Sequence, residues 1–284
     1  MPSIYTKLKQ FIATIKPIKN FYLRYIKGYD GFVRIYPTLK CNLRCVYCTN
    51  ECHKNNGEDR KGEYEEIDFG RWASALKKLG RPVIITGGEP TLYPQIIELL
   101  NALSDFKLRV KLYTNLVWSK EFANRFINEM KNENVTLFVS YHSLTSPQKF
   151  AETILLLKNN NKFTGTIHTI LEGENADRVN AAIKLFRTLG ISVYTEKNYD
   201  CEYYEASSQT NRQKVRCSKK IFIIAPDGNR YQCVSKMLRK KNPLENIFDE
   251  ECKKLNPQIT SICYDYGACA NCDMLGDTKI KKLG

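Results

Sequence analysis

The sequence of 284 residues contains no long hydrophobic run. Its longest apolar stretch is about that of residues 221–225, whereas a membrane-spanning helix needs about 20 apolar residues. A signal peptide is not apparent either, because lysines alternate with apolar residues at the N-terminus. These absences favour a cytoplasmic, reducing location. In such a location, the eleven cysteines are better explained as metal ligands than as disulfides.

Acidic residues are comparatively few. The chain has 30 Asp and Glu residues against 44 Lys and Arg residues, which gives a net charge of +14. This surplus serves solubility, and it also fits an anionic partner such as a nucleic acid, a phosphorylated substrate, an acidic peptide or a membrane surface. Charge alone does not choose between these partners.

Residues 1–31 are basic and show helical periodicity. No acidic residue precedes Asp30, and apolar residues recur at helical spacing on both sides of Pro17. We therefore expect two short amphipathic helices. Packing on the main domain is the simpler interpretation, and docking on a membrane surface or a partner is the alternative.

Strand and helix patterns alternate over residues 32–198. Asp68 and Ser146 are placed as helix N-caps, and Gly190 as a C-cap. Six such alternations predict a parallel α/β sheet, either doubly wound or a partial barrel. The cysteine-rich residues 199–284 are predicted to form a separate small module. Strands are predicted over residues 32–36, 83–86, 108–113, 136–140, 163–171 and 191–196, and helices over 69–79, 93–103, 121–130, 147–157 and 175–189.

Three closely spaced cysteines follow the first predicted strand. Cys41, Cys45 and Cys48 form a C-x3-C-x2-C pattern, at the edge where parallel α/β sheets bind ligands. A zinc site would need a fourth ligand, which Cys52 or His53 could supply. A ferredoxin-type cluster is another alternative. In the ferredoxin pattern, however, two residues separate the first two cysteines, whereas three residues separate Cys41 from Cys45.

The second predicted strand ends in Gly87-Gly88-Glu89-Pro90. Glycines allow a ligand to approach the backbone closely. The C-x3-C-x2-C pattern, with an aromatic residue before its third cysteine and a later strand that ends in Gly-Gly-Glu-Pro, resembles the radical S-adenosylmethionine (radical SAM) family. The resemblance covers about residues 32–198 and implies a partial (β/α)6 TIM-like barrel.

The resemblance also implies the cofactors. Cys41, Cys45 and Cys48 would hold a 4Fe–4S cluster, and S-adenosylmethionine would occupy its open iron. Reductive cleavage would then release a 5′-deoxyadenosyl radical that abstracts hydrogen from a substrate. The matching positions around S-adenosylmethionine are Tyr47 beside the adenine, Gly87, Gly88 and Glu89 at the methionine amine, Ser140 at the ribose, and Asn115 and Thr169 at comparable strand ends.

Three further residues lie near these motifs. If one iron stays open, Cys52 is not a ligand. The simpler interpretation of His53 is a solvated loop histidine. His142 follows Ser140 closely and would face the substrate. The alternative is that His142 is an ordinary histidine at a strand end whose ring nitrogens are hydrogen-bonded within the fold.

Residues 199–284 carry a second cysteine pattern. Cys217 and Cys233 flank a predicted β-hairpin with a Pro-Asp-Gly turn, and Cys269 and Cys272 form a C-x2-C pair. This arrangement resembles the twitch version of the SPASM extension, which implies an auxiliary 4Fe–4S cluster on these four cysteines. Cys263 could replace one ligand or act as a hydrogen donor, and a structural zinc is the alternative to the cluster. Cys201 and Cys252 belong to no motif.

These patterns predict an oxidoreductase-like radical SAM enzyme. Its substrate would be a peptide or a small natural-product intermediate, with net oxidation, cross-linking or epimerisation as the outcome. An external electron donor such as a flavodoxin or a ferredoxin is the expected protein partner. An RNA-modifying enzyme is the alternative that the positive charge suggests. A non-catalytic zinc or iron–sulfur module that docks through the basic N-terminus is an alternative of another class.

Overall fold

A computed structural model describes residues 32–45, 47–48, 50, 67–131, 134–163, 165–171, 176–197, 213–219, 222–250, 259–266 and 278–283. The predicted N-terminal helices lie outside these residues. So do six residues discussed above: Cys52, His53, Cys201, Cys252, Cys269 and Cys272. Among the helices in the described ranges, none has the length and apolar content to cross a membrane.

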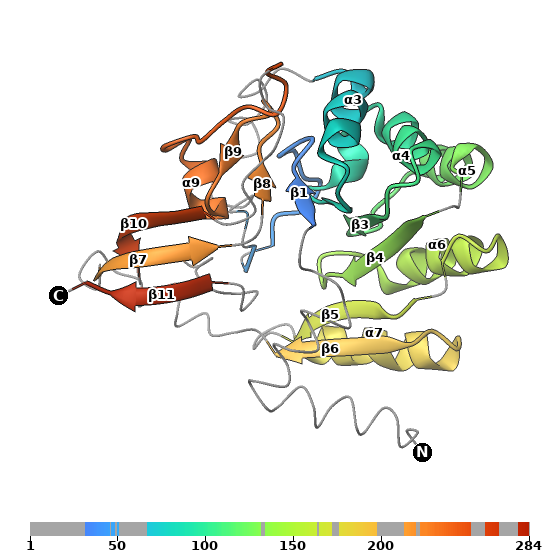
Figure 1. Ribbon diagram of the computed structural model, residues 1–284. Coiled ribbons are helices and arrows are strands. Elements are labelled where there is room, and N and C mark those ends of the chain that lie inside the picture. Colours follow the sequence, from blue (N-terminus) through green and yellow to red (C-terminus); the bar gives the residue numbers. More distant parts are fainter. Residues whose placement is uncertain are drawn as a thin grey trace, which may run out of the picture.

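Eight strands form one open sheet in the order β6-β5-β4-β3-β2-β1-β8-β9 (Figure 1). All neighbours are parallel except β8 and β9, which form an antiparallel pair. The six predicted strands are confirmed, and the α/β class with an unclosed, barrel-like sheet is confirmed with them. The strands are β1 (Val33–Ile35), β2 (Val83–Ile85), β3 (Val110–Thr114), β4 (Val135–Tyr141), β5 (Ile167–Leu171), β6 (Val193–Lys197), β8 (Phe222–Ile224) and β9 (Arg230–Tyr231).

The helices lie along one side of this curved sheet, as Figure 1 shows for α3 to α7. The helix predicted to begin at Tyr93 begins instead at Ile96. Tyr93 precedes Pro94, which disfavours helical backbone angles, and Tyr93 is extended. The helices are α3 (Phe69–Leu79), α4 (Ile96–Asp105), α5 (Lys120–Glu129), α6 (Pro147–Asn159), α7 (Ala176–Thr188) and α9 (Val234–Leu238), with a 3-10 turn η2 (Pro90–Leu92).

The predicted helix caps are confirmed. The Asp68 side chain accepts a hydrogen bond from the Gly70 N–H at 2.8 Å, and Ser146 accepts one from the Lys149 N–H at 3.4 Å. Gly190 follows α7 with a φ of 67°, a left-handed conformation that glycine adopts without steric cost. Local sequence therefore sets where these helices start and stop.

The core lies between the parallel strands and the helices. Val33, Ile35, Val83 and Ile85 are fully buried, as expected for strands covered on both faces. Trp72 of α3 is also fully buried, and its ring meets that of Phe248 edge-on at 5.0 Å. The C-terminal part of the chain thus contributes to the same core.

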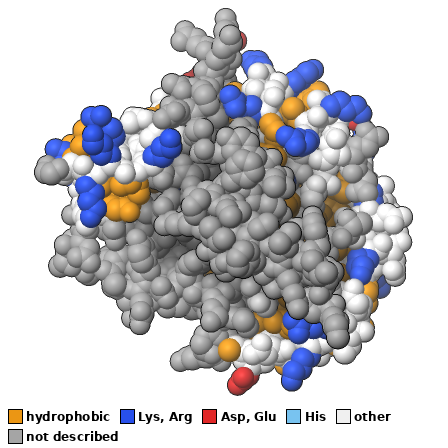
Figure 2. Space-filling model, turned by 60° about the horizontal axis from the view of Figure 1, so that its bottom comes forward, with side chains coloured by type: hydrophobic (Ala, Val, Ile, Leu, Met, Phe, Trp, Pro, Cys, Tyr) orange, Lys and Arg blue, Asp and Glu red, His pale blue; other side chains and the backbone are white. Residues whose placement is uncertain are grey.

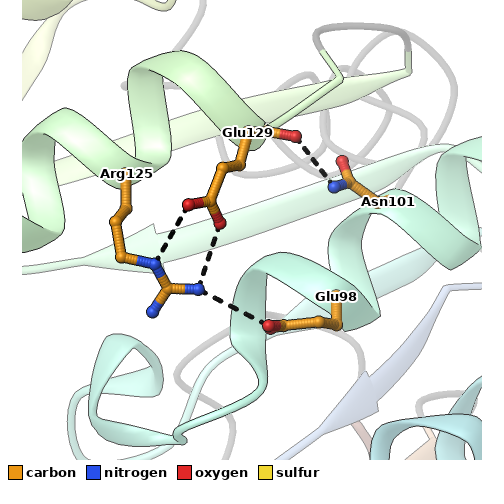
Figure 3. Close-up of polar contacts among 4 residues, drawn as sticks. All are labelled: Glu98, Asn101, Arg125 and Glu129. Carbon is orange, nitrogen blue, oxygen red and sulfur yellow. Dashed lines mark hydrogen bonds and ion pairs between the residues drawn. The ribbon is translucent and has the colours of Figure 1, made fainter.

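Polar contacts connect α4 and α5 on the surface (Figure 3). Arg125 pairs with Glu129 of its own helix at 3.1 Å and with Glu98 of α4 at 3.5 Å. The Asn101 side chain donates to the Glu129 carbonyl at 2.9 Å. Because the charged groups are exposed, these pairs contribute little to stability.

The chain after residue 198 forms two pieces of sheet. The predicted hairpin with its Pro-Asp-Gly turn is confirmed as β8 and β9, and β8 pairs in parallel with β1, Ile35 opposite Ile224. A separate antiparallel sheet has the order β10-β7-β11, with β7 (Gln213–Lys219), β10 (Ile259–Tyr266) and β11 (Thr278–Lys282). The boundary at residues 198 and 199 stays a prediction, although β8 and β9 belong to the main sheet.

Candidate functional site

The segment that leads from β1 to Cys41 lies against the end of β2. The Gly88 N–H donates to the Thr38 carbonyl at 3.2 Å, and the Glu89 N–H donates to the Lys40 carbonyl at 2.7 Å. These bonds continue the pairing of β1 and β2 beyond the two strands. The cysteine loop therefore begins at the carboxyl edge of the sheet, where ligands bind in parallel α/β folds.

Gly87 and Gly88 are required by this close approach. A Cβ atom on Gly87 would lie 2.2 Å from the Thr38 carbonyl oxygen, and one on Gly88 would lie 2.1 Å from that of Lys40. The sequence suggests that these glycines admit a ligand. In the structure, the group that excludes a side chain at both positions is the chain's own backbone.

The Glu89 side chain joins the ends of β2 and β3. It is buried, with 1% of its surface exposed. One carboxylate oxygen accepts hydrogen bonds from the Thr91 N–H (3.2 Å), the Thr91 hydroxyl (2.7 Å) and the Thr114 hydroxyl (2.8 Å). The other oxygen accepts from the Asn115 N–H at 2.7 Å. Burial raises the pKa of the Glu89 carboxyl above its ordinary value, and the four hydrogen bonds oppose that rise.

Asn115 extends this network to the cysteine loop. Its Nδ2 donates to Asn42 Oδ1 at 2.8 Å and lies 3.9 Å from Cys41 Sγ. Its Oδ1 accepts from the Val117 N–H at 2.9 Å, and the Asn42 side chain donates to the Val117 carbonyl at 2.8 Å. The end of β3 therefore holds the loop at Cys41 and Asn42.

Tyr47 and His142 contact each other directly. Their rings stack with centroids 5.7 Å apart and an interplanar angle of 26°. The Tyr47 hydroxyl lies 2.8 Å from His142 Nδ1. Burial lowers the pKa of His142 from 6.5 to about 4, so the imidazole is neutral at pH 7 and can accept this hydrogen bond.

Ser140 and Thr169 lie on neighbouring strands. Ser140 is half-buried near the end of β4, opposite His168 of β5. Thr169 lies near the end of β5, two positions before Leu171. The buried Thr169 hydroxyl donates to the Tyr141 carbonyl at 3.1 Å and so joins β4 to β5. The role of Ser140 at a ribose and that of Thr169 in cofactor binding stay predictions.

The donor chemistry of the loop fits an iron–sulfur cluster. Cys45 is buried, and Cys41 and Cys48 are partly exposed. The Leu43 N–H points at Cys41 Sγ at 3.4 Å, and N–H groups directed at sulfur tune iron–sulfur sites. Over the described ranges, no three His, Cys, Asp or Glu side chains are gathered as a ready-made metal site. The role of Cys41, Cys45 and Cys48 as ligands stays a prediction.

The described C-terminal cysteines lie in one neighbourhood. Burial raises the pKa of the Cys217 thiol, and the nearby thiols of Cys263 and Cys233 raise it further. Lys219 and Lys236 act in the opposite direction. Because such interactions weaken with distance, Cys263 and Cys233 each lie within electrostatic range of Cys217. The three thiols are not gathered as a metal site within the described residues.

Polar side chains form a hydrogen-bonded group beside the backbone of Cys217. The Gln232 side chain donates to the Cys217 carbonyl at 3.0 Å and accepts from Lys236 at 2.7 Å. Ser261, which is opposite Cys217 on β10, also bonds to Gln232. Cys269 and Cys272 lie outside the described residues, so the complete ligand set stays a prediction.

The sequence analysis missed Thr114 and Asn42. Thr114 bonds to Glu89, and Asn42 bonds to Asn115. A signal for Thr114 exists, because Thr114 and Asn115 form a polar pair where an alternating strand ends. Asn42 has no comparable signal, since one asparagine in a loop has many ordinary uses.

Comparisons with known proteins agree with this arrangement. The model of the radical SAM superfamily matches residues 35–196. A probable GTP 3',8-cyclase of Methanopyrus kandleri is 37% identical over 92 residues, which cover 32% of this chain and 28% of that protein. A PqqA peptide cyclase of Bradyrhizobium diazoefficiens is 35% identical over 92 residues, which cover 31% of this chain and 22% of that protein. Both matches span less than a third of the relative's own length.

Among solved structures, Streptococcus suis SuiB bound to S-adenosylmethionine is similar, with a TM-score of 0.47 and 13% identity. It covers 84% of this chain, and the chain covers 69% of it. The superfamily match spans more than half of the chain and includes the cysteine loop and residues 87–89. It confirms the predicted enzyme class and its cofactors, a 4Fe–4S cluster and S-adenosylmethionine. The chain belongs to the radical SAM superfamily.

Proposed function

We propose that this enzyme cleaves S-adenosylmethionine reductively and abstracts hydrogen from a peptide or a small natural-product intermediate, with net oxidation, cross-linking or epimerisation. The observation that carries the proposal is the hydrogen-bonded contact between residues 38–40 and residues 87–89. This contact joins the loop of Cys41, Cys45 and Cys48 to the polar strand ends at the carboxyl edge of the sheet.

The chain's own residues bind and orient the cofactor in this proposal. The bound cluster and S-adenosylmethionine supply one-electron cleavage and a hydrogen-abstracting radical. Cys41, Cys45 and Cys48 would be the iron ligands, and the Glu89 network would keep their loop in place. Tyr47, held by His142, would lie beside the adenine.

The C-terminal cysteines bear on the outcome of the reaction. Cys217, Cys233, Cys269 and Cys272 would hold an auxiliary cluster that accepts an electron from the substrate, which favours oxidation or cross-linking. Cys263 lies close to Cys217 and would instead return a hydrogen atom in an epimerisation. Relatives named as a GTP cyclase and a PqqA peptide cyclase support a small-molecule or peptide substrate.

The test is anaerobic reconstitution followed by iron and sulfide quantification, EPR and detection of 5′-deoxyadenosine. We expect about eight irons per wild-type chain and about four in a Cys41/Cys45/Cys48→Ala variant, as for two 4Fe–4S clusters. The variant should make no 5′-deoxyadenosine. A Cys201/Cys252→Ala variant is the matched control and should keep both the iron and the product.

Three other results would change the proposal. About four irons together with zinc in the wild type would make the C-terminal site structural and remove the argument for oxidation. Loss of the cofactor product in the control variant would show that the first variant reports on folding and not on ligation. Absence of 5′-deoxyadenosine from iron-loaded, reduced wild type would contradict the proposal.

A further inference from the structure

The register of the β10-β7-β11 sheet defines two faces. Val215, Cys217 and Lys219 are buried on one face, whereas Lys214 and Arg216 are exposed on the other. Arg216 lies opposite Ile262 on β10 and opposite Lys281 on β11. We define the outer face as the residues that share the side of Arg216, together with Tyr264, which contacts Lys214. They are Lys214, Arg216, Ser218, Thr260, Ile262, Tyr264, Lys279 and Lys281.

The outer face carries a basic stripe. Lys214 and Arg216 follow each other at alternate positions of β7, and Lys279 and Lys281 do so on β11. Alternate residues of a strand are about 6.8 Å apart, and neighbouring strands are about 4.8 Å apart. Four positive charges therefore lie close together on the described positions of β7 and β11.

An apolar stripe runs beside the basic one. Ile262 is 43% exposed and Tyr264 is 63% exposed, the largest exposed fraction among the large hydrophobic residues described. The Lys214 ammonium lies 5.8 Å from the centre of the Tyr264 ring. Figure 2 shows Lys and Arg side chains around hydrophobic ones at the left of the molecule, where Figure 1 places this sheet.

A partner that matches this face needs negative charges and apolar groups side by side. A single-stranded nucleic acid supplies phosphates, but it binds such sheets by stacking successive bases on several aromatic rings. Tyr264 is the one aromatic residue of the outer face, and Ile262 cannot stack a base in that way. An acidic peptide supplies both carboxylates and aliphatic side chains.

We propose that the outer face binds an acidic, partly apolar segment of a peptide. Carboxylates would meet Lys214, Arg216, Lys279 and Lys281, and apolar side chains would cover Ile262 and Tyr264. In an extended peptide, alternate side chains recur at the same spacing of about 6.8 Å as the basic residues of β7. The identity of this peptide as the substrate rests on the proposed function.

The opposite face of the same sheet carries Cys217, with Cys263 close to it. A peptide anchored on the outer face would therefore be tethered near the candidate C-terminal site without occupying it. Anchoring raises the local concentration of the rest of the peptide, as for any two linked binding events.

The test is fluorescence anisotropy with the full chain and a short fluorescein-labelled peptide of alternating Glu and Leu. We expect Lys279→Glu/Lys281→Glu to weaken binding about tenfold or more, because it replaces two attractions by repulsions. Tyr264→Ala should weaken binding several-fold. The matched control, Lys149→Glu/Lys184→Glu on exposed positions of α6 and α7, has the same change of charge and should bind within about twofold of wild type.

Equal weakening in both double variants would show that only net charge matters and would overturn the proposal. Tighter binding of a labelled oligouridylate, lost in Lys279→Glu/Lys281→Glu, would assign the face to nucleic acid and overturn it as well. Cleavage of S-adenosylmethionine by the wild type is measured separately. A chain that binds the acidic peptide as expected but makes no 5′-deoxyadenosine would refute the proposed function and leave this inference intact.

Discussion

At the scale of single residues, Glu89 is the most constrained polar side chain of the candidate site. Four donors surround its two oxygens, and three of the four bonds are 2.8 Å or shorter. Its carboxylate holds the ends of β2 and β3 together and, through Asn115, the start of the cysteine loop. If Glu89 also binds the methionine amine of S-adenosylmethionine, it does so in addition to holding these segments together.

We predict that Glu89→Gln destabilises the fold by about 2–4 kcal/mol, because the amide NH2 must face at least one N–H or O–H donor in a buried place. Chemical denaturation of the cluster-free protein measures this change. Glu98→Gln is the matched control, and because its ion pair with Arg125 is exposed, it should cost less than about 1 kcal/mol. Unchanged stability of Glu89→Gln would mean that the carboxyl is already protonated.

His142 makes stability depend on pH. Its pKa is about 4 in the folded chain, against 6.5 for an unperturbed histidine. Between these values the unfolded chain binds a proton that the folded chain does not, so stability falls as the pH drops from 6.5 towards 4. Over this whole interval, His142 changes the free energy of unfolding by about 3 kcal/mol.

We therefore predict that His142→Gln flattens the dependence of the unfolding free energy on pH between 6.5 and 4. The measurement is a series of denaturation curves for both proteins across this interval. For each protein we compare the change in unfolding free energy from one pH to another and not its absolute value. The reason is that the substitution also removes the contact with Tyr47 at every pH. Parallel pH profiles for the two proteins would show that His142 is not the titrating group.

At the scale of elements, the decisive contact is that of the cysteine loop with the end of β2. Residues 38–40 leave β1 without forming a strand, yet their carbonyls bond to residues 88 and 89. Gly87 and Gly88 allow the backbones of the two segments to approach this closely, because a Cβ atom at either position would overlap a carbonyl of residues 38–40. The position of Cys41 therefore depends on residues that lie more than forty positions later in the chain.

We predict that Gly88→Ala costs about 2 kcal/mol or more and lowers the iron content after reconstitution, because its Cβ would overlap the Lys40 carbonyl. Thermal unfolding and iron quantification measure the two effects. Gly190→Ala is the control: nothing lies within 4 Å of its Cβ, and only its left-handed φ of 67° is strained, at about 1 kcal/mol. Full iron loading of Gly88→Ala would refute the proposed dependence of the cysteine loop on this contact.

At the scale of the whole molecule, the C-terminal part of the chain completes the main sheet and core. β1 pairs with β2 on one side and with β8 on the other. Ile224 of β8 is fully buried in the same hydrophobic cluster as Val33 and Leu112. Phe248 packs on Trp72 of α3. These contacts join residues on both sides of the predicted boundary at residue 198 into one core.

We predict that Ile224→Ala lowers the unfolding temperature of the whole chain in a single transition and costs about 3 kcal/mol, because the cavity opens in the shared core. Circular dichroism and tryptophan fluorescence measure it, since Trp72 and Trp118 lie in the main part of the chain. The exposed Leu244 is the control, and Leu244→Ala should change stability by less than about 0.5 kcal/mol. A variant that loses only a separate C-terminal transition would show that the two parts unfold independently.

The sequence by itself determined the order of strands and helices, their caps, the cysteine motif and the Gly-Gly-Glu segment. These features are local: alternation, helical spacing and capping are decided by residues a few positions apart. The resemblance carried by the motifs was sufficient to predict the family and its cofactors.

Tertiary structure alone decided which groups those motifs meet. Tyr47 reaches His142 across 95 positions, Glu89 bonds to Thr114 and Asn115, and β8 pairs with β1. The approach of residues 38–40 to Gly87 and Gly88, and the separation of basic from buried residues on β7, also depend on strand register. Register and long-range pairing follow from the packing of the whole core, which no local pattern in the sequence contains.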